Sequence, residues 1–236
     1  MKKIKFFAVA VCLAISSGVY AQSTNTSSGS PSTDINTNGW STIWIEYNPI
    51  KIKFDNISGA NDESLNGFSA GYSRAFRISQ DAPIFLEAGV GLQYANYSDS
   101  EIGYIEDYGK VSIDEDVTVW SAKVPVNFLY NFAIPNSSIS LAPFVGTTLR
   151  YNISGTLTGE IDNYSVKYDL FDKKEMNDAE ILDGKAWKRF QIGWQIGLKA
   201  RFGQKIMAGI SYGNDFSEIA YKSTIQTTSI SIGYTF

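Results

Sequence analysis

Residues 189–202 read RFQIGWQIGLKARF, and this stretch decides the fold. From Phe190 to Phe202 every second residue is apolar, and the residues between them are glycine, glutamine or a cation. Successive side chains of a β-strand point to opposite faces, so the alternation predicts a strand with one apolar and one polar face. Strands of soluble proteins average about 5–6 residues. A run as long as this one therefore disfavours a soluble sandwich.

The same alternation recurs along the chain and predicts about eight strands in all. Three segments are nearly as regular, namely residues 84–95, 120–132 and 139–152. Four more complete the set: Trp40–Phe54, Gly67–Ile78, Lys205–Phe216 and Lys222–Phe236. Phe144 is a misfit, because it falls on the polar face of its segment. Within Trp40–Phe54 the apolar positions change phase at Asn48-Pro49, which predicts a bulge there, since proline is tolerated at bulges and not within a continuous ladder.

The chain is interpreted as one domain behind an export signal. Residues 1–21 begin with lysines, continue with an apolar run too short to span a bilayer and end in small residues, a pattern typical of a cleaved signal peptide. Residues 22–39 are rich in serine, threonine, asparagine and glycine, so we expect a disordered leader. Residues 40–236 form the predicted barrel domain. The single cysteine, Cys12, lies in the signal peptide, so the mature chain can form no disulfide.

The connections between the predicted strands alternate in length. Short turns are expected at residues 79–83, 133–137 and 203–204, and longer connections at 55–66, 98–116, 154–186 and, more modestly, 217–221. Aromatic residues gather near both ends, with Phe76, Phe85, Phe132, Phe202 and Phe236 at one and Tyr94, Trp120, Tyr151, Trp187, Tyr212 and Phe216 at the other. Two such belts are typical of membrane barrels. We therefore expect an all-β fold, a transmembrane antiparallel up-and-down β-barrel with short periplasmic turns and longer extracellular loops.

Charged residues on the polar face of these segments are expected to point into the barrel. They are Glu46, Glu87, Lys123, Arg150, Arg189, Lys199 and Arg201. The basic members could line an anion path. The interior of an eight-stranded barrel is just wide enough for side chains to fill it, so we favour ion pairing with the two glutamates.

The chain ends in ISIGYTF, with Phe236 last and Tyr234, Ile232 and Ile230 at the alternate positions before it. This ending resembles the C-terminal signature of bacterial outer-membrane β-barrels, which their insertion machinery reads. Together with the export signal and the strand count, the chain resembles the small porin-like or PorT-like barrels, with an eight-stranded barrel similar to those of OmpA and OmpX. The resemblance covers residues 40–236 as architecture and carries no catalytic motif. It implies insertion into the bacterial outer membrane, with Phe236, Tyr234, Ile232 and Ile230 as the insertion signal.

The composition argues against catalysis. Barrel enzymes of the outer membrane resemble one another in using histidine as an acid or base, and this chain has no histidine. We predict no catalytic, cofactor-binding or metal-binding residues. The acidic segment 98–116 could bind Ca²⁺ through oxygen ligands, but its spacing matches no EF-hand, so solvated loop charge is the favoured interpretation. Residues 172–184 predict a short helix that packs on the barrel rim or contacts a partner.

The leading hypothesis is a non-enzymatic barrel that serves a structural or interaction role through its extracellular loops. A narrow porin-like channel and a component of an envelope secretion or assembly complex are the alternatives. The expected partners are outer-membrane lipid, the insertion machinery, and an extracellular ligand or envelope protein. The acidic balance disfavours nucleic acid, and a closed sheet needs no second copy, so a monomer is expected.

Overall fold

The computed structural model describes residues 39–54, 62–105, 109–161, 164–178, 186–220 and 222–236. The strands in chain order are β1 (Gly39–Tyr47), β2 (Ile50–Phe54), β3 (Glu63–Arg77), β4 (Ile84–Ile105), β5 (Gly109–Tyr130), β6 (Phe132–Ala133), β7 (Ile139–Ile161), β8 (Tyr164–Asp169), β9 (Phe190–Phe202), β10 (Ile206–Asp215) and β11 (Ser223–Thr235). The described part also holds one short helix, α2 (Lys173–Asp178). No helix in this part is long and apolar enough to cross a membrane. The predicted signal peptide 1–21 and residues 22–38 of the predicted leader lie outside the described residues.

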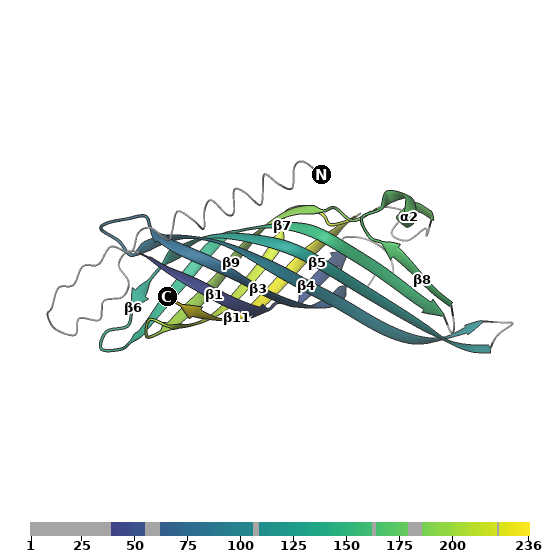
Figure 1. Ribbon diagram of the computed structural model, residues 1–236, viewed down its shortest axis with the longest axis horizontal. Coiled ribbons are helices and arrows are strands. Elements are labelled where there is room, and N and C mark those ends of the chain that lie inside the picture. The colour runs from purple at the N-terminus through teal and green to yellow at the C-terminus, as the bar shows by residue number, and fades with distance from the viewer. Residues whose placement is uncertain (1–38, 55–61, 106–108, 162–163, 179–185, 221) are drawn as a thin grey trace. The chain divides into compact units, whose positions relative to one another are not determined.

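The strands form one antiparallel sheet that closes into a barrel (Figure 1). The halves β1 and β2 both pair with β3 on one side and with β11 on the other, so they act as one strand and close the sheet. Strand β6 continues β5 along β7, and β8 pairs with the far part of β7. In the described residues eight strands therefore make the wall, and the predicted all-β antiparallel barrel is confirmed.

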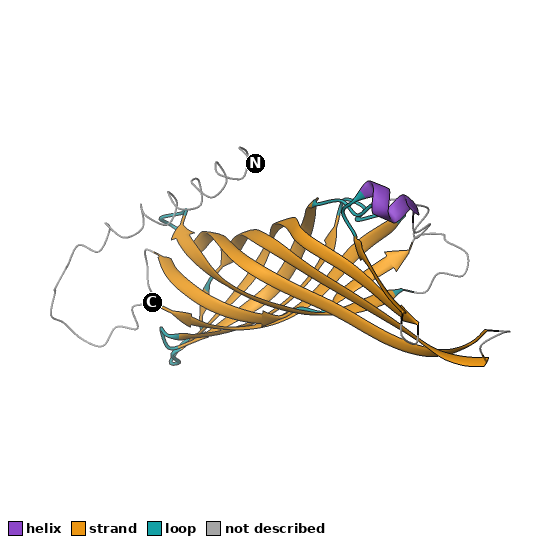
Figure 2. Cartoon of the chain, turned by 45° about the vertical axis from the view of Figure 1, so that its right-hand side comes forward, coloured by secondary structure: helices purple, strands orange, loops and turns teal. Residues whose placement is uncertain are grey.

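The two ends of the barrel differ. Short turns join the strands at one end, called the turn end below, where the chain also terminates. There Ser41 and Phe236 exchange two backbone hydrogen bonds, each 2.9 Å long. The other end, called the loop end, carries the long β4–β5 hairpin, β8 and α2 (Figure 2).

The predicted bulge at Asn48-Pro49 is wrong. The register of this strand against β3 runs without a shift from Tyr47 opposite Phe68 to Ile50 opposite Leu65. What changes at this point is the surroundings. Ile45 points outward and is 60% exposed, whereas Ile50 points inward and is 6% exposed. The apolar positions change face because the barrel interior becomes apolar toward the loop end. The register shift in the described strands lies elsewhere, between Trp120 and Ser121 on β5.

The predicted loop 98–116 is also wrong over most of its length. Strands β4 and β5 remain paired from Ser98 opposite Asp116 out to Ile105 opposite Gly109. Within the predicted loop 154–186, β7 likewise runs on to Ile161 and β8 folds back onto it. An alternation of apolar and polar residues does not mark these segments, because water reaches both faces of a hairpin beyond the barrel. There the strands are continued by backbone hydrogen bonds between neighbours.

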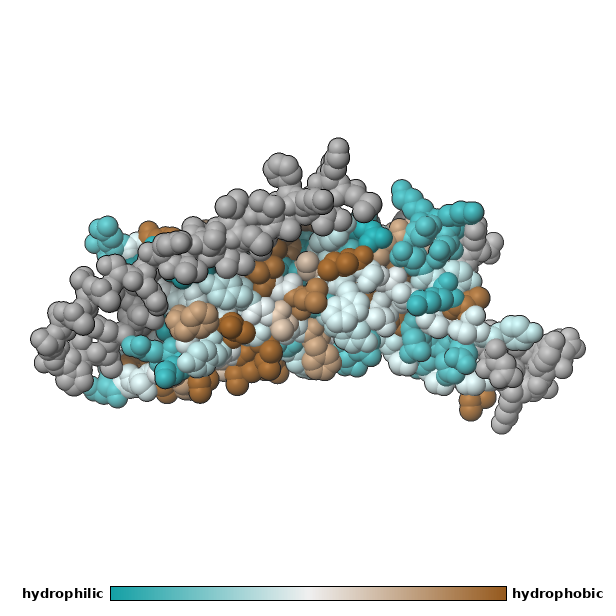
Figure 3. Space-filling view, in the orientation of Figure 1, coloured by the Kyte–Doolittle hydropathy of each residue, from teal (hydrophilic) through white to brown (hydrophobic). Residues whose placement is uncertain are grey.

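On the face shown in Figure 3, brown apolar side chains and pale side chains of intermediate hydropathy lie between the two ends, where teal side chains are more frequent. The outward side chains include Ile196, Ile210, Phe128, Val145, Ile230 and Ile232, each more than half exposed. Most of the predicted aromatic belts also face outward. The prediction is wrong for two members of the belts. Phe85 points into the bore, and Trp187 packs against buried residues at the loop end.

Candidate functional site

Polar side chains fill the middle of the bore and form three ion pairs. Lys123 Nζ lies 2.6 Å from Glu46 Oε1, and Lys199 Nζ contacts Glu87 Oε1. Arg150 Nη1 lies 2.7 Å from Asp215 Oδ2. All six side chains are largely buried, so their charges are far better neutralised in pairs than alone. These six residues are called the polar layer below.

Neutral side chains extend the polar layer. Asn127 donates to Glu87 Oε1 over 3.0 Å and accepts from Gln195 Nε2 over 2.6 Å. Ser69 donates to Glu46 over 3.2 Å, and Arg150 donates to Gln191 over 3.2 Å. These bonds and the ion pairs join strands from all around the wall. Such a network holds the charged groups in fixed places.

Asp215 is the member of the polar layer that sequence reasoning missed. It ends β10, and the charged residues singled out from the sequence lie on other strands. A signal is present, because Asp215 continues the inward series of Ser211 and Gly213. Applying the alternation of β10 to its last residue finds it.

Two predicted interior residues do not join these pairs. Arg201 is 2% exposed, its guanidinium lies 4.2 Å from the centre of the Trp40 ring, and among the described residues it has no carboxylate within ion-pair distance. Arg189 lies just before β9 at the loop end, where it donates to the carbonyl of Ile153 over 2.8 Å and covers the Phe171 ring. Arg189 thus connects β7 to the segment around Phe171 at the loop end, and Arg201 packs near the turn end.

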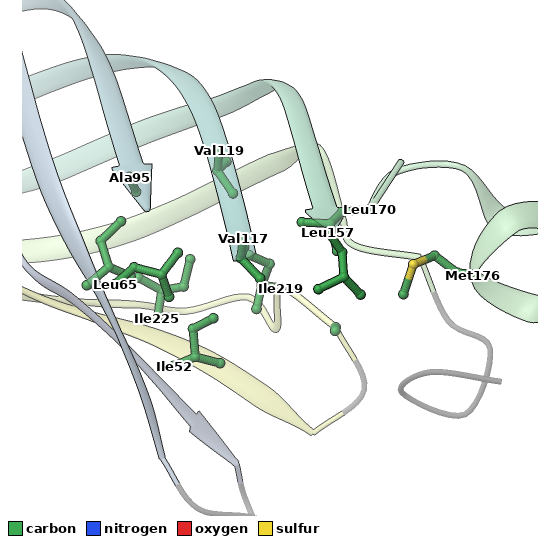
Figure 4. Close-up of a cluster of buried hydrophobic side chains, with 12 residues drawn as sticks. Ile52, Leu65, Ala95, Val117, Val119, Leu157, Leu170, Met176, Ile219 and Ile225 are labelled. Carbon is green, nitrogen blue, oxygen red and sulfur yellow. The ribbon is translucent and has the colours of Figure 1, made fainter. Parts of the chain in front are cut away.

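Apolar side chains close the bore on both sides of the polar layer. At the turn end the buried cluster consists of Trp40, Ala75, Phe85, Leu129, Ala142 and Phe144. Phe144, the misfit of its strand, is thereby explained as an inward plug residue. At the loop end a larger cluster includes Ile52, Leu65, Val117, Leu157, Leu170 and Met176 (Figure 4). The two cavities found within the polar layer measure about 40 Å³ and 20 Å³, room for little more than single water molecules.

Helix α2 completes the closure of the loop end. Asp172 Oδ1 accepts hydrogen bonds from the backbone of Lys174 and Glu175, at 2.8 Å and 3.2 Å, and so caps the helix where it was predicted to begin. Met176 is fully buried in the loop-end cluster. The helix therefore packs on the rim, which is one of the two predicted alternatives. Residues 179–184 of the predicted helix lie outside the described residues.

A sheet projects beyond the barrel at the loop end. It consists of β8 and the outer parts of β4, β5 and β7, from Tyr97 to Ile105, Gly109 to Asp116 and Ser154 to Ile161, and is called the extension below. Within the described residues β8 pairs with β7 alone. Tyr164 and Val166 of β8 are 84% and 53% exposed. The extension thus presents an open strand edge with exposed apolar side chains.

Carboxylates face one another across the extension. Asp99 lies opposite Glu115, and Asp114 lies opposite Glu160. Loss of hydration between the strands, together with the negative charges of Glu63 and Asp99, raises the pKa of Glu115. The described residues include no group of three histidine, cysteine or acidic side chains placed to hold a metal ion. Like charges directly opposite each other weaken strand pairing, so these carboxylate pairs lower the stability of the extension.

Comparisons with known proteins give structures of similar architecture and no sequence family. No family model and no curated protein matches the chain. The structure of Ail, the attachment invasion locus protein of Yersinia pestis, is similar with 16% sequence identity and a TM-score of 0.45, over 84% of this chain and 99% of that one. Neisserial surface protein A gives 12% identity and a TM-score of 0.42 over 83% and 97% of the two chains. A major outer membrane protein of Thermus thermophilus gives 12% identity and a TM-score of 0.37 over 82% and 99%. The expected architecture of a small eight-stranded barrel is seen in the strand pairing itself, and the finer likeness to PorT-like proteins is not confirmed.

Proposed function

We propose that this chain is a non-enzymatic, monomeric β-barrel of the bacterial outer membrane that contacts a partner through its extension. The outward apolar wall supports the membrane location. Each large apolar side chain left in water forgoes about 1.5–3 kcal/mol of burial free energy. The wall exposes many such side chains around the barrel, a surface far more apolar than soluble monomers present. Acyl chains are the surroundings in which this wall is stable.

The orientation follows from the two ends. The turn end, with short connections and the C-terminus, faces the periplasm, and the loop end faces the exterior. Residues 1–21 act as the cleaved export signal. Phe236, Tyr234, Ile232 and Ile230 act as the signal for the insertion machinery, and Phe236 stands at the turn end, hydrogen-bonded to Ser41.

The closed bore favours an interaction role over the channel alternative. Ions would have to pass two apolar layers and an ion-paired layer whose cavities hold only a few water molecules. The extension is the observation that carries the proposal. An open edge such as that of β8 offers unpaired backbone N–H and C=O groups, to which an extended segment of a partner can add as a further strand.

The proposal is tested by shortening the extension while keeping the barrel. Leu157 and Tyr168 lie opposite each other, so replacing residues 158–167 with Asn-Gly closes a hairpin at that pair and removes most of the open edge of β8. The variant should fractionate with the outer membrane and keep the anomalous gel mobility of an unheated barrel. Crosslinking on intact cells should yield adducts with the wild-type chain that this variant lacks. Recovery of the wild-type chain in soluble fractions would refute the membrane location, and identical adducts from both chains would refute the role of the extension.

A further inference from the structure

A groove of about 620 Å³ runs over the outer wall, across strands β11, β1, β3, β4 and β5. Its floor is Ala70, which lies opposite Ile45 on β1 and opposite Leu92 on β4. The small side chain of Ala70 therefore stands between two large ones that project outward. A methyl group in a row of branched side chains leaves a hollow in the wall at this position.

Aromatic side chains bound the groove on the side of the loop end. Tyr47, Phe68, Tyr94 and Trp120 lie opposite one another in a single row across four strands. The ring centres of Tyr47 and Phe68 are 5.1 Å apart, and those of Tyr94 and Trp120 are 5.0 Å apart. Aromatic rows of this kind lie at the level of the lipid headgroups. The groove below the row thus lies at the depth of the upper acyl chains.

Two lysines project outward on the same face, beyond the aromatic row. Lys51 and Lys53 follow Tyr47 on the strand that forms one side of the groove. Lys51 is about half exposed and lies 2.8 Å from Asp62. The hydrogen bond from Lys51 lowers the pKa of Asp62, and the nearby charge of Lys53 adds to the effect. Among the described residues around the two lysines Asp62 is the one outward carboxylate, and across β3 and β4 the next outward carboxylates lie on β5, three strands away, so the excess positive charge is local to β2. This charge complements a phosphate group.

We propose that the groove binds one acyl chain of a phosphate-bearing lipid, with the phosphate at Lys51 and Lys53. The inference rests on the proposed membrane location. Lining of aliphatic and aromatic side chains suits hydrocarbon, and a flexible chain can follow a shallow curved surface. A second copy of this protein suits the groove less well. Two copies related by a twofold axis would bring hollow against hollow and leave a void without dispersion contacts.

The test uses folded full-length protein in detergent micelles, with phosphatidylglycerol and phosphatidylcholine of identical acyl chains as the probes. Native mass spectrometry should find one phosphatidylglycerol retained per protein. The Ala70→Phe substitution fills the groove and should lower the retained fraction about tenfold, since the buried hydrocarbon contacts are lost. Ala200→Phe is the matched control, because Ala200 faces outward on β9 and does not line the groove, so it should retain lipid as the wild type does.

The headgroup part of the proposal has its own variant. Lys51→Gln with Lys53→Gln should abolish the preference for phosphatidylglycerol over phosphatidylcholine, and Lys188→Gln, an exposed lysine elsewhere at the loop end, should leave it unchanged. Equal retention by wild type and Ala70→Phe would overturn the site. A dimer that Ala70→Phe dissociates would overturn it in favour of a second copy. Outer-membrane recovery of the same variants tests the membrane location separately from the lipid site. A wild-type protein that fractionates with the membrane but retains no lipid would contradict the lipid site alone.

Discussion

Lys123 and Glu46 lie 77 positions apart in the chain, on β5 and β1, yet their Nζ and Oε1 atoms are 2.6 Å apart inside the barrel. Two intervening strands, β3 and β4, separate them along the wall. The contact therefore crosses the bore rather than following the sheet. It can form only when the sheet has curled, so it reports the curvature of the wall rather than the pairing of neighbouring strands.

Removing one partner of this pair should destabilise the barrel strongly. Lys123→Met keeps the length of the side chain but leaves Glu46 buried without its cation, and should lower the free energy of unfolding by about 3–5 kcal/mol. Urea-induced unfolding in phospholipid vesicles measures the effect. Adding Glu46→Gln to Lys123→Met removes the stranded charge and should restore a large part of the loss.

The control for this prediction is an exposed ion pair. Lys188 and Glu218 are 4.0 Å apart and about half exposed. Lys188→Met should change stability by no more than about 0.5 kcal/mol, because exposed pairs contribute little. A loss for Lys123→Met as small as that of the control would show that the bore is hydrated well enough to carry an unpaired carboxylate.

The barrel wall could be predicted from the sequence because outward-facing apolar positions and interior positions alternate strictly there. Strand β9 has the predicted bounds, Phe190–Phe202. Even the misfit Phe144 carries information. A single apolar residue on the polar face marks the layer that closes the turn end of the bore.

The loop end could not be predicted in the same way, because the rule that assigns faces is reversed there. Above Pro49 the outward residue is Lys51 and the inward residues are Ile50 and Ile52. On this strand an apolar residue points outward before Pro49 and into the closed interior after it. The sequence shows the reversal as a phase change, which has the same appearance as a bulge. Only the pairing register distinguishes a reversed environment from an inserted residue.

The extension should become more stable as the pH falls. The pKa of Glu115 is raised above its ordinary value of 4.5 by loss of hydration and by the charges of Glu63 and Asp99. A folded-state pKa above the unfolded value means that the folded extension binds the proton more tightly. The stabilisation is therefore complete below pH 4.5 and is lost as the pH rises through the higher folded pKa.

Hydrogen exchange of the backbone amides in β4 and β5 measures this effect, once corrected for the pH dependence of the intrinsic exchange rate. Protection of the extension should increase on going from neutral to mildly acidic pH. Glu115→Gln should show the acidic level of protection at both pH values, and amides in β9 should show no change. Protection that decreases on acidification in the wild type would contradict the assigned sign.

The bore should conduct no steady ionic current in planar bilayers. The prediction extends to variants that open one layer. Leu129→Ala and Phe144→Ala each remove a large buried side chain at the turn end and should lower stability by about 2–5 kcal/mol. They should still not conduct, because the polar layer and the loop-end cluster remain closed. Reproducible single-channel steps from the wild-type protein would instead favour the porin-like alternative.

The terminal Phe236 should matter for insertion in cells more than for stability. Its ring is 59% exposed on the outer wall, and its backbone bonds to Ser41 do not depend on the side chain. Phe236→Ala should therefore refold in detergent nearly as well as the wild type, with a loss of about 1 kcal/mol or less. In cells it should accumulate several-fold less in the outer membrane if Phe236 acts as the proposed insertion signal. Phe202→Ala is the matched control, since Phe202 is a similarly exposed aromatic at the turn end that is not terminal. Equal depletion of both variants from the outer membrane would mean that the aromatic belt, rather than the C-terminal signal, limits insertion.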